Sequence, residues 1–426
     1  MNFEPSSFLN TNEESLSARK EDGLGDSMRA IRPLVSVIVT NYNYAAFLEQ
    51  AVSSVMSQTY PNIECVIVDD RSTDESPSVI ARLKTRYPNL RTFVNEANGG
   101  QSVSCLEGFE RTLGAYVIFL DADDYLLPDC VETHIRAHLS LRIPVGFTSV
   151  DMIQLVNERI TTTTFEGFSN FVRSGAGLGH NIVREWEPQQ VAGQPKLKKS
   201  LHYVPARDAG QWPWAPTSAN CFRRDALNLV MNNRRLRELR INTDTYLLRG
   251  VTALCGSVLV DAPLAVYRIH PSNNFTLHAD LHHLRAFKTS LWKQNSQIAM
   301  SSIIDHIVDS LPELSLQMEY RYIVEALIGL SDAFPKVEAS RFGLNYLTEV
   351  LLKRRRWFFD TIGKDRFYDI LSYGSKPKKR FLTLLANGVL PVVSWAIDRG
   401  YIFPAAASGP GAPETKVLES TAISSE

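Results

Sequence analysis

The chain has 426 residues, of which 44% are apolar and 21% are charged, and its 45 basic side chains nearly balance 46 acidic ones. This apolar fraction is high enough to offset chain entropy, which excludes wholesale disorder. A protein that binds nucleic acid through phosphate contacts needs a basic excess, so a net charge of −1 disfavours nucleic acid as a partner.

The length predicts two or three domains, or one large domain with additions. The five cysteines lie scattered in apolar segments and form no Cys-x-x-Cys pair; they are Cys65, Cys105, Cys130, Cys221 and Cys255. Such a set is typical of reduced thiols in the core of a cytoplasmic protein, so we expect a cytoplasmic location.

The first segments predict a leader followed by a strand–helix–strand unit. Residues 1–30 are polar and lack the basic start and apolar stretch of a signal peptide, which predicts a disordered leader. A β-branched run over 34–40 is typical of a strand buried on both faces. Apolar residues one turn apart over 47–56 predict a helix, and 63–68 predicts a second strand.

The alternation of strands and helices continues for a further 70 residues or so, at the pace of βαβ units. Helices are expected over 74–87, 101–113 and 128–140, and strands over 90–95 and 116–120. This order predicts an α/β fold with a doubly wound, mostly parallel sheet flanked by helices. In such sheets ligands bind at the carboxyl ends of the strands.

The pattern weakens after residue 150. Residues 151–215 are rich in Gly, Pro and aromatic residues, which predicts an irregular insertion or a substrate-facing loop region. Regular signals then return, with strands at 218–222 and 257–267, helices at 223–230 and 243–254, further helices at 282–298, 316–333 and 339–359, and a disordered tail at 404–426.

Three carboxylates follow the strand over 116–120, namely Asp121, Asp123 and Asp124. They would repel one another unless a cation lay among them, and Mg²⁺ or Mn²⁺ would accept these oxygen ligands together with phosphate oxygens. The alternative is an acidic turn that caps the next helix through its macrodipole.

Two more polar clusters stand at strand ends. Asn41-Tyr42-Asn43 could present an aromatic face and short polar side chains to a planar base, or could be a plain Asn-rich turn. Asp69-Asp70 could accept hydrogen bonds from a nucleobase N–H or a ribose hydroxyl, and the residues after it could cap a helix.

Other nucleotide and metal signatures are missing. No Gly-rich fingerprint follows the first strand and no Walker A sequence occurs, which disfavours a dinucleotide cofactor and P-loop hydrolysis. His134 and His138 stand four residues apart, as do His278 and His282, and without further matched ligands we expect both pairs to lie on solvated helix faces.

In order and spacing, the three strand-end clusters resemble those of the family 2 glycosyltransferases, whose nucleotide-sugar domain has the GT-A fold. The resemblance covers residues 34 to about 140 and resumes at 216–225, 242–247 and 267–273. It implies an inverting, metal-dependent transfer of a sugar from a nucleoside diphosphate donor, with a UDP-sugar favoured. The acceptor would be a hydroxyl in glycan, polysaccharide or glycolipid synthesis, including lipid-linked acceptors.

The resemblance also implies roles on the donor side. The matching residues Thr40, Tyr42 and Asp70 would hold the nucleotide base, and Asp121 would contact the ribose or the sugar. The segment 98–102, which includes Gly100, would line the donor pocket.

The metal and the general base are implied in the same way. Asp123, in the Asp-Ala-Asp motif, resembles the acid that holds Mn²⁺ or Mg²⁺, and His270 would ligate the metal, touch the diphosphate or fix its own loop. Asp244 matches the general base of a Glu-Asp pair, with Thr243 in place of the Glu. That replacement supports one alternative, a non-catalytic relative that binds a sugar nucleotide or a glycan.

Trp212 and Trp214 leave two interpretations open, because aromatic faces stack on sugar rings and also fill cores. At the other end, residues 353–380 hold ten Lys/Arg, and the uncharged stretch 381–397 is shorter than the roughly 20 residues of a spanning helix. This pairing predicts peripheral contact of 353–397 with the cytoplasmic face of a membrane, or a helix packed on the domain with a solvated basic face.

The expected domain organisation follows from these segments. A GT-A domain would occupy 31–278, with a nucleotide-binding half at 31–140 and an acceptor half at 141–278. A mostly helical C-terminal region would occupy 279–403.

Overall fold

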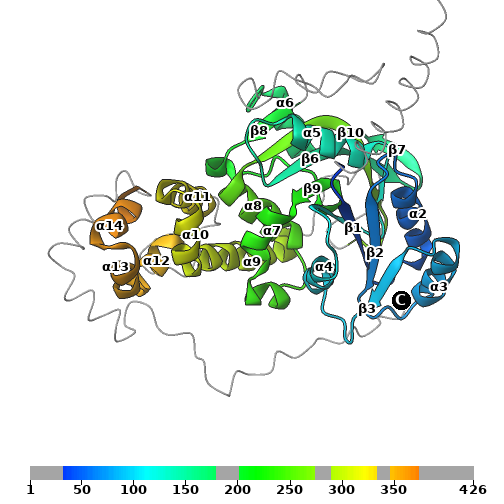
Figure 1. Cartoon of the computed structure of the whole chain (residues 1–426), viewed down its shortest axis with the longest axis horizontal. Helices are drawn as coiled ribbons and strands as arrows, with labels where there is room; N and C mark the ends of the chain where they lie inside the picture. Colours follow the sequence, from blue (N-terminus) through cyan, green and yellow to red (C-terminus); the bar gives the residue numbers. More distant parts are fainter. Residues whose placement is uncertain (1–31, 179–200, 274–288, 333–345, 374–426) are drawn as a thin grey trace, which may run out of the picture. The chain divides into compact units, whose positions relative to one another are not determined.

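A computed structural model describes residues 32–178, 201–273, 289–332 and 346–373 (Figure 1). These residues belong to two compact units, one within Met1–Pro335 and the other within Lys336–Glu426. The predicted leader, the predicted tail, the uncharged stretch 381–397 and the pair His278 and His282 lie outside the described residues.

A ten-stranded sheet forms the centre of the first unit, in the order β3-β2-β1-β4-β9-β6-β10-β5 with β7 beside β6 and β8 beside β10. The first four strands of that order run parallel, as do β6 and β10, while β9 is antiparallel to β4 and β6. The strands are β1 (Val35–Asn41), β2 (Ile63–Asp69), β3 (Arg91–Val94), β4 (Tyr116–Asp121), β5 (Tyr125–Leu126), β6 (Phe147–Val156), β7 (Arg159–Thr162), β8 (Leu201–Val204), β9 (Asn220–Arg223) and β10 (Ser257–Ile269).

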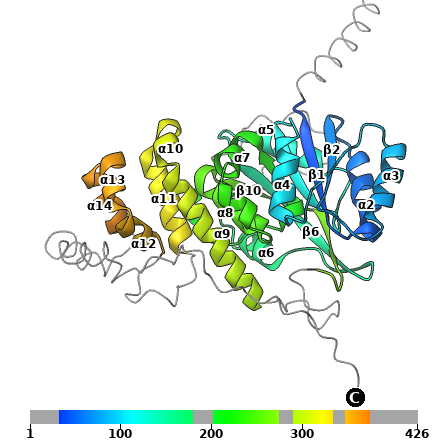
Figure 2. The same cartoon turned by 90° about the horizontal axis from the view of Figure 1, so that it is seen from below.

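Helices cover both faces of this sheet. α2 (Ala45–Met56) and α3 (Ser76–Arg86) lie on one side of β1 and β2, and α4 (Gln101–Glu110) lies on the other (Figure 2). A Cβ at Gly108 would lie 2.3 Å from Cγ2 of Ile38, so this glycine allows α4 to approach β1 closely. The predicted α/β fold, with a mostly parallel sheet flanked by helices, is confirmed.

The region expected to be irregular, 151–215, contains more regular structure than its sequence indicated. β6 is a ten-residue strand in the middle of the sheet, and β7, α6 (Glu166–Arg173) and β8 follow it. Polar residues interrupt the apolar pattern of β6, but they find partners in the fold. Asp151 accepts hydrogen bonds from the backbone N–H groups of Met152 and Phe165 and from the hydroxyl of Thr164.

His134 and His138 correct another expectation, because they are buried rather than solvated. Both stand on α5 (Cys130–Ser140), which packs on β6 and β10. Nδ1 of His134 lies 2.7 Å from the Thr148 hydroxyl, and Nε2 of His138 donates to the Cys221 carbonyl at 3.0 Å. Burial lowers the pKa of His134 to about 3 and that of His138 to about 4.

The cysteines are free thiols, as predicted. Four are buried and Cys255 is half-buried. Burial raises the pKa of Cys65 to about 12 and that of Cys255 to about 12, so these thiols are protonated at neutral pH.

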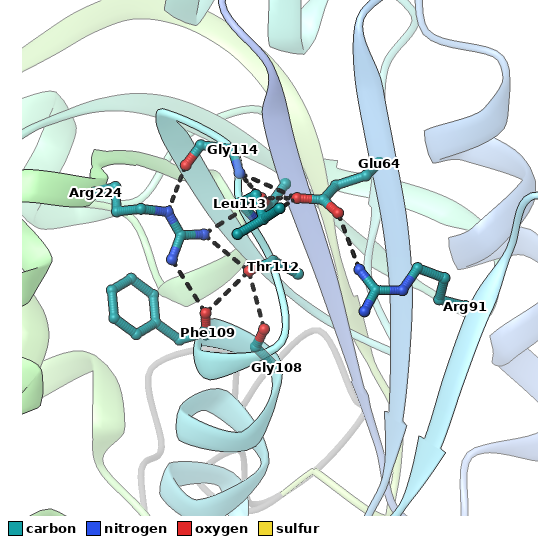
Figure 3. A network of polar contacts seen from close by, with 9 residues as sticks. Glu64, Arg91, Gly108, Phe109, Thr112, Leu113, Gly114 and Arg224 are labelled. Carbon is teal, nitrogen blue, oxygen red and sulfur yellow. Dashed lines mark hydrogen bonds and ion pairs between the residues drawn. The ribbon is translucent and has the colours of Figure 1, made fainter.

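A polar network ties the start of the sheet together, at the end opposite the strand-end clusters. Figure 3 shows Glu64 of β2 beside the turn between α4 and β4, where it accepts hydrogen bonds from the backbone N–H groups of Leu113 (2.7 Å) and Gly114 (3.0 Å). The Ser36 hydroxyl donates to the same carboxylate at 2.7 Å. Burial alone would raise the pKa of Glu64, but these bonds and the charge of Arg91 hold the pKa below its ordinary value.

Arg224 contacts the other side of the turn between α4 and β4 (Figure 3). Its guanidinium donates to the carbonyls of Gly114 (2.6 Å) and Phe109 (3.1 Å) and to the hydroxyl of Thr112 (2.9 Å), and it lies 4.5 Å from the Phe109 ring centroid. The turn therefore has both of its backbone faces satisfied by side chains distant in sequence.

The described residues of the C-terminal part, 289–332 and 346–373, are mostly helical, as predicted. In the first unit, α9 (Thr289–Asp309), α10 (Leu311–Gln317) and α11 (Tyr320–Asp332) follow the sheet, and α9 and α11 pack against α8 (Thr243–Cys255), whose other neighbours include α7 (Arg224–Met231). The second unit contains α12 (Tyr346–Lys353), α13 (Arg355–Ile362) and α14 (Lys364–Tyr373). Within the described residues, none of the helices combines the length and apolar character needed to cross a membrane.

Candidate active site

The carboxyl ends of β1, β2 and β4 gather the three polar clusters. Thr40 is paired with Val68 of β2 and with Asp121 of β4, so the parallel register places the three strand ends side by side. The Thr40 hydroxyl donates to Oδ1 of Asp121 at 3.0 Å. Residues that are 81 positions apart in the chain therefore form one polar surface at the edge of the sheet.

The loops after β1 and β2 interlock around Asn43. This residue has a φ of +60°, and its Oδ1 accepts hydrogen bonds from the backbone N–H groups of Thr73 (2.7 Å) and Asp74 (3.3 Å). The Asn-rich turn thus has a clear structural role. Tyr42, just before it, is 44% exposed and leaves an aromatic ring available at the strand ends.

Asp70 anchors the segment Asn98–Ser102, which we call the donor segment. Its Oδ1 accepts from Asn95 Nδ2 (2.7 Å) and the Gly99 N–H (2.9 Å), and its Oδ2 accepts from the Gly100 N–H (2.7 Å). Gly100 has a φ of +87°, and a Cβ there would lie 2.4 Å from the carbonyl oxygen of Arg240. Only glycine meets both conditions without strain.

Asp121 receives a second hydrogen bond from the donor segment, since Gln101 Nε2 donates to its Oδ1 at 2.8 Å. Burial and then the charge of Asp123 raise the pKa of Asp121 to about 7, and the charge of Asp244 adds to this rise. Asp121, at the end of β4, therefore feels the charge of a carboxylate from its own turn and of one from α8.

Asp123 and Asp124 have different surroundings. Oδ2 of Asp123 lies 3.1 Å from Nε2 of His270 and 3.3 Å from Nδ2 of Asn273. Asp124 is 1% exposed, and it accepts hydrogen bonds from the Ser218 hydroxyl (2.7 Å) and the Arg268 backbone N–H (3.3 Å). Asp124 therefore fixes the turn, which leaves Asp121 and Asp123 as the carboxylates of this motif that are candidates for ligand contact.

These residues fit a divalent cation that is shared with a substrate. Within the described residues, no group of three or more His, Cys, Asp and Glu is arranged to hold an ion by itself. Mg²⁺-type ions are commonly held by one or two carboxylates, with the remaining positions taken by phosphate and water. Burial, and after it the negative charge of Asp123, raises the pKa of Asp121, and a cation bound beside these carboxylates would favour their ionised forms.

Asp244 stands in the first turn of α8, where Asn242 with a φ of +66° begins the helix. Its Oδ1 accepts from the backbone N–H of Thr245 at 2.6 Å, and burial raises the pKa of Asp244 while the charge of Arg249 opposes the rise. Arg249 is buried, donates to the carbonyl of Ala209 at 3.1 Å and also bonds that of Gly210.

The two tryptophans separate into a core residue and a half-buried residue beside Arg249. Trp214 is fully buried and donates through Nε1 to the Ser257 hydroxyl at 2.9 Å, so it is part of the core. Trp212 is half-buried, lies edge-on to Trp214 at 5.9 Å, and has the Arg249 guanidinium 5.4 Å from its ring centroid.

Arg240 was not expected from the sequence. Its carbonyl accepts from the Gln101 N–H at 2.9 Å, and its guanidinium donates to the Asn98 carbonyl at 3.0 Å. No motif marks an arginine whose main contribution is a backbone carbonyl. Gln101 lies in the expected donor segment, but its bond to Asp121 depends on the tertiary fold.

Comparison with known proteins gives three findings. The sequence profile of Glycosyl transferase family 2 matches residues 36–179. The uncharacterized glycosyltransferase alr2836 of Nostoc sp. is 31% identical over 296 residues, which cover 67% of this chain and 81% of that protein. The chondroitin synthase of Pasteurella multocida is 36% identical over 107 residues, which cover 25% of this chain and 11% of the synthase.

Among solved structures, Staphylococcus aureus TarS in complex with UDP aligns with a TM-score of 0.45 and 16% identity. The alignment covers 86% of this chain and 91% of that one.

Proposed function

Because the chain belongs to the family 2 glycosyltransferases, we propose that it is a metal-dependent, inverting enzyme that uses a nucleoside diphosphate sugar. The donor we favour is a UDP-sugar, and the acceptor is a hydroxyl of a glycan, polysaccharide or glycolipid. The observation that carries the proposal is the meeting of the strand-end clusters: the Thr40 hydroxyl and Gln101 Nε2 both donate to Asp121, and Nε2 of His270 lies 3.1 Å from Oδ2 of Asp123.

Donor binding would use the strand ends. The exposed ring of Tyr42 offers a face on which a base can stack. A carboxylate has about four lone-pair sites, and Asp70 uses three of them on protein donors. One site is therefore left for a base N–H. Thr40 and Gln101 orient Asp121 through its Oδ1, which leaves Oδ2 for a ribose or sugar hydroxyl.

Asp123 and His270 would hold Mn²⁺ or Mg²⁺. When bound, the ion neutralises the negative charge that develops on the departing diphosphate. In the structure His270 already bonds Asp123, and its ring is stacked on Phe47 with 4.6 Å between centroids. The ring is thus fixed in place before any ligand arrives, which favours a defined geometry at the diphosphate.

Asp244 would act as the general base. A sugar hydroxyl becomes a strong nucleophile only as it loses its proton, and a carboxylate in hydrogen-bond reach removes that proton while the bond to the anomeric carbon forms. Burial raises the pKa of Asp244, which makes it a better proton acceptor, while the hydrogen bond from the Thr245 N–H and the charge of Arg249 oppose the rise. Attack from the face opposite the diphosphate inverts the anomeric centre.

Hydrolysis of a panel of UDP- and GDP-sugars with Mn²⁺ tests these roles. We expect the wild type to release nucleoside diphosphate, Asp123→Ala to lose this activity with or without added metal, and Asp244→Asn to keep UDP binding but lose turnover by about 100-fold or more. Full hydrolytic activity of Asp123→Ala would refute the role of Asp123 in metal binding. Full hydrolytic activity of Asp244→Asn would refute the role of Asp244 as the base. A wild type that binds donor but never turns it over would favour the non-catalytic alternative.

Cytoplasmic location and membrane contact through 353–397 are part of the same proposal. The described portion of this stretch has exposed Lys353 and Lys364, and residues 374–397 lie outside the described ranges. A basic segment next to an apolar one is attracted to an anionic lipid surface. Such contact would bring the enzyme to a lipid-linked acceptor.

A further inference from the structure

The donor segment makes hydrogen bonds to three parts of the candidate site, at the ends of β2 and β4 and at the start of α8. Gly99 and Gly100 donate to Asp70, Gln101 donates to Asp121, and Ser102 contacts Thr243, the residue just before Asp244. A displacement of this short segment would therefore shift both the residues proposed to bind the donor and Asp244, the proposed base.

The connection toward α8 begins with the backbone. The Gln101 N–H donates to the Arg240 carbonyl at 2.9 Å, and Arg240 Nη1 donates back to the Asn98 carbonyl at 3.0 Å. Because a Cβ at Gly100 would clash with the same carbonyl, the two backbones are in direct contact. The loop that leads into α8 is thus held against the donor segment on both sides.

The hydroxyls of Ser102 and Thr243 complete the connection at a distance of 2.6 Å. Both residues are fully buried, so water cannot replace the bond if either hydroxyl is removed. A buried polar group that loses its partner pays its full desolvation cost, and such a bond therefore holds its two segments in one arrangement.

We propose that Thr243 is a positioning residue, which couples the donor segment to the start of α8 through Ser102 and thereby sets the location of Asp244 relative to the donor. The proposal rests on the roles proposed above for the donor segment and Asp244. It gives Thr243 a function of its own at the position where the resembling family has Glu. Reactions between bound groups are sensitive to shifts of about 1 Å, which can cost about 100-fold in rate.

The test uses donor hydrolysis with Mn²⁺ and UDP-N-acetylglucosamine, or the UDP-sugar that the donor panel shows to be hydrolysed fastest. Thr243→Val keeps the branched shape and removes the hydroxyl, Thr243→Ser keeps the hydroxyl, and Ser102→Ala removes the bond from the other side. Thr252→Val is the matched control, because Thr252 on the same helix makes an equally buried hydroxyl bond, 3.0 Å to Ser257. Thermal unfolding of each variant accompanies the kinetics.

We expect Thr243→Val and Ser102→Ala each to lower kcat about tenfold while KM for the donor changes less than about twofold. The double variant should be no slower than the slower single variant, because both changes remove one bond. Thr243→Ser should stay within about twofold of the wild type, and Thr252→Val should lose stability without losing kcat. If Thr243→Val does not fold, Ser102→Ala and Thr243→Ser decide the matter.

Three results would overturn the coupling: wild-type kcat in Thr243→Val or Ser102→Ala, an equal loss in Thr243→Ser and Thr243→Val, or losses that multiply in the double variant. Asp244→Asn is assayed alongside to separate the two proposals. Activity of that variant at the wild-type rate would refute the base assignment itself. An inactive Asp244→Asn beside a fully active Thr243→Val would refute only the coupling.

Discussion

Gly100 offers a direct test of how the donor segment is built, through the substitution Gly100→Ala. The residue has a φ of +87° and a ψ of 176°, a region of backbone space that is essentially restricted to glycine. Placing another residue there costs about 1–3 kcal/mol. The new Cβ would also lie 2.4 Å from the Arg240 carbonyl oxygen, which belongs to the backbone and cannot simply rotate away.

The clash forces one partly buried connection to break, either the bond from the Gly100 N–H to Asp70 or that from the Gln101 N–H to Arg240. Leaving such a group without its partner costs about 1–3 kcal/mol more. The sum is about 2–6 kcal/mol, and we expect it to appear mainly as a disordered donor segment. At about 1.4 kcal/mol for each tenfold, UDP should bind at least about 30-fold more weakly.

Calorimetric titration with UDP and Mn²⁺, together with urea unfolding, measures both effects. Gly175→Ala is the matched control, because Gly175 also has a positive φ (+67°) but a Cβ there would meet nothing within 4 Å. That variant should lose about 1–2 kcal/mol of stability, the cost of the left-handed region alone, and keep its affinity for UDP. The reasoning is refuted if Gly100→Ala binds UDP as tightly as the wild type, or if it loses no more stability than the control.

Three further predictions concern the rest of the molecule. Glu64→Gln should lower the free energy of unfolding by about 1–3 kcal/mol, because it weakens the hydrogen bonds from the Leu113 and Gly114 N–H groups. Since the fold lowers the pKa of Glu64, the wild type is more stable than the variant above the ordinary pKa, and this difference should disappear when urea unfolding is repeated at falling pH. The pKa values of His134 and His138 lie below that of histidine in the unfolded chain, so the unfolded state binds more protons. The free energy of unfolding should therefore fall by up to about 2.7 kcal/mol for each pH unit below about 6.5. His138→Gln should halve that slope, and an unchanged slope would contradict the burial of His138. Flotation with vesicles that contain anionic lipid should recover the full chain, and replacing Lys376, Lys378, Lys379 and Arg380 by Gln should reduce recovery several-fold; equal flotation would reject contact through the basic stretch.

The strand ends could be predicted because their signals are local. A β-branched run followed by acids or by Asn and Tyr marks both the strand and the point where it stops, and parallel pairing then brings Thr40 and Asp121 together. The same reasoning placed Asp70 and Asp123 near one edge of the sheet. Each of the three clusters lies within a few residues of the apolar strand that predicts its position.

Other features depend on partners far away in the sequence. His134 and His138 look like a solvated pair until Thr148 and the Cys221 carbonyl are folded against them. β6 has a polar residue at Asp151, and two of its hydrogen-bond partners, the Thr164 hydroxyl and the Phe165 N–H, lie more than ten positions later. Arg240 accepts the Gln101 N–H through its backbone carbonyl, and a pattern of side chains cannot predict a contact of the backbone.

The burial of α8 has a practical consequence for anyone who shortens this chain. The helix carries Asp244 at its first turn, and almost every residue from Thr245 to Leu254 is enclosed by α7, α9, α11 and the short turns around Ala206. Gly250 lies near Val230 on one side and Ile303 on the other, where even a methyl group would be in contact. A fragment that stopped after β10 would therefore uncover one side of the helix that carries Asp244, the residue we propose as the base, and the shortest version worth expressing extends at least to Asp332.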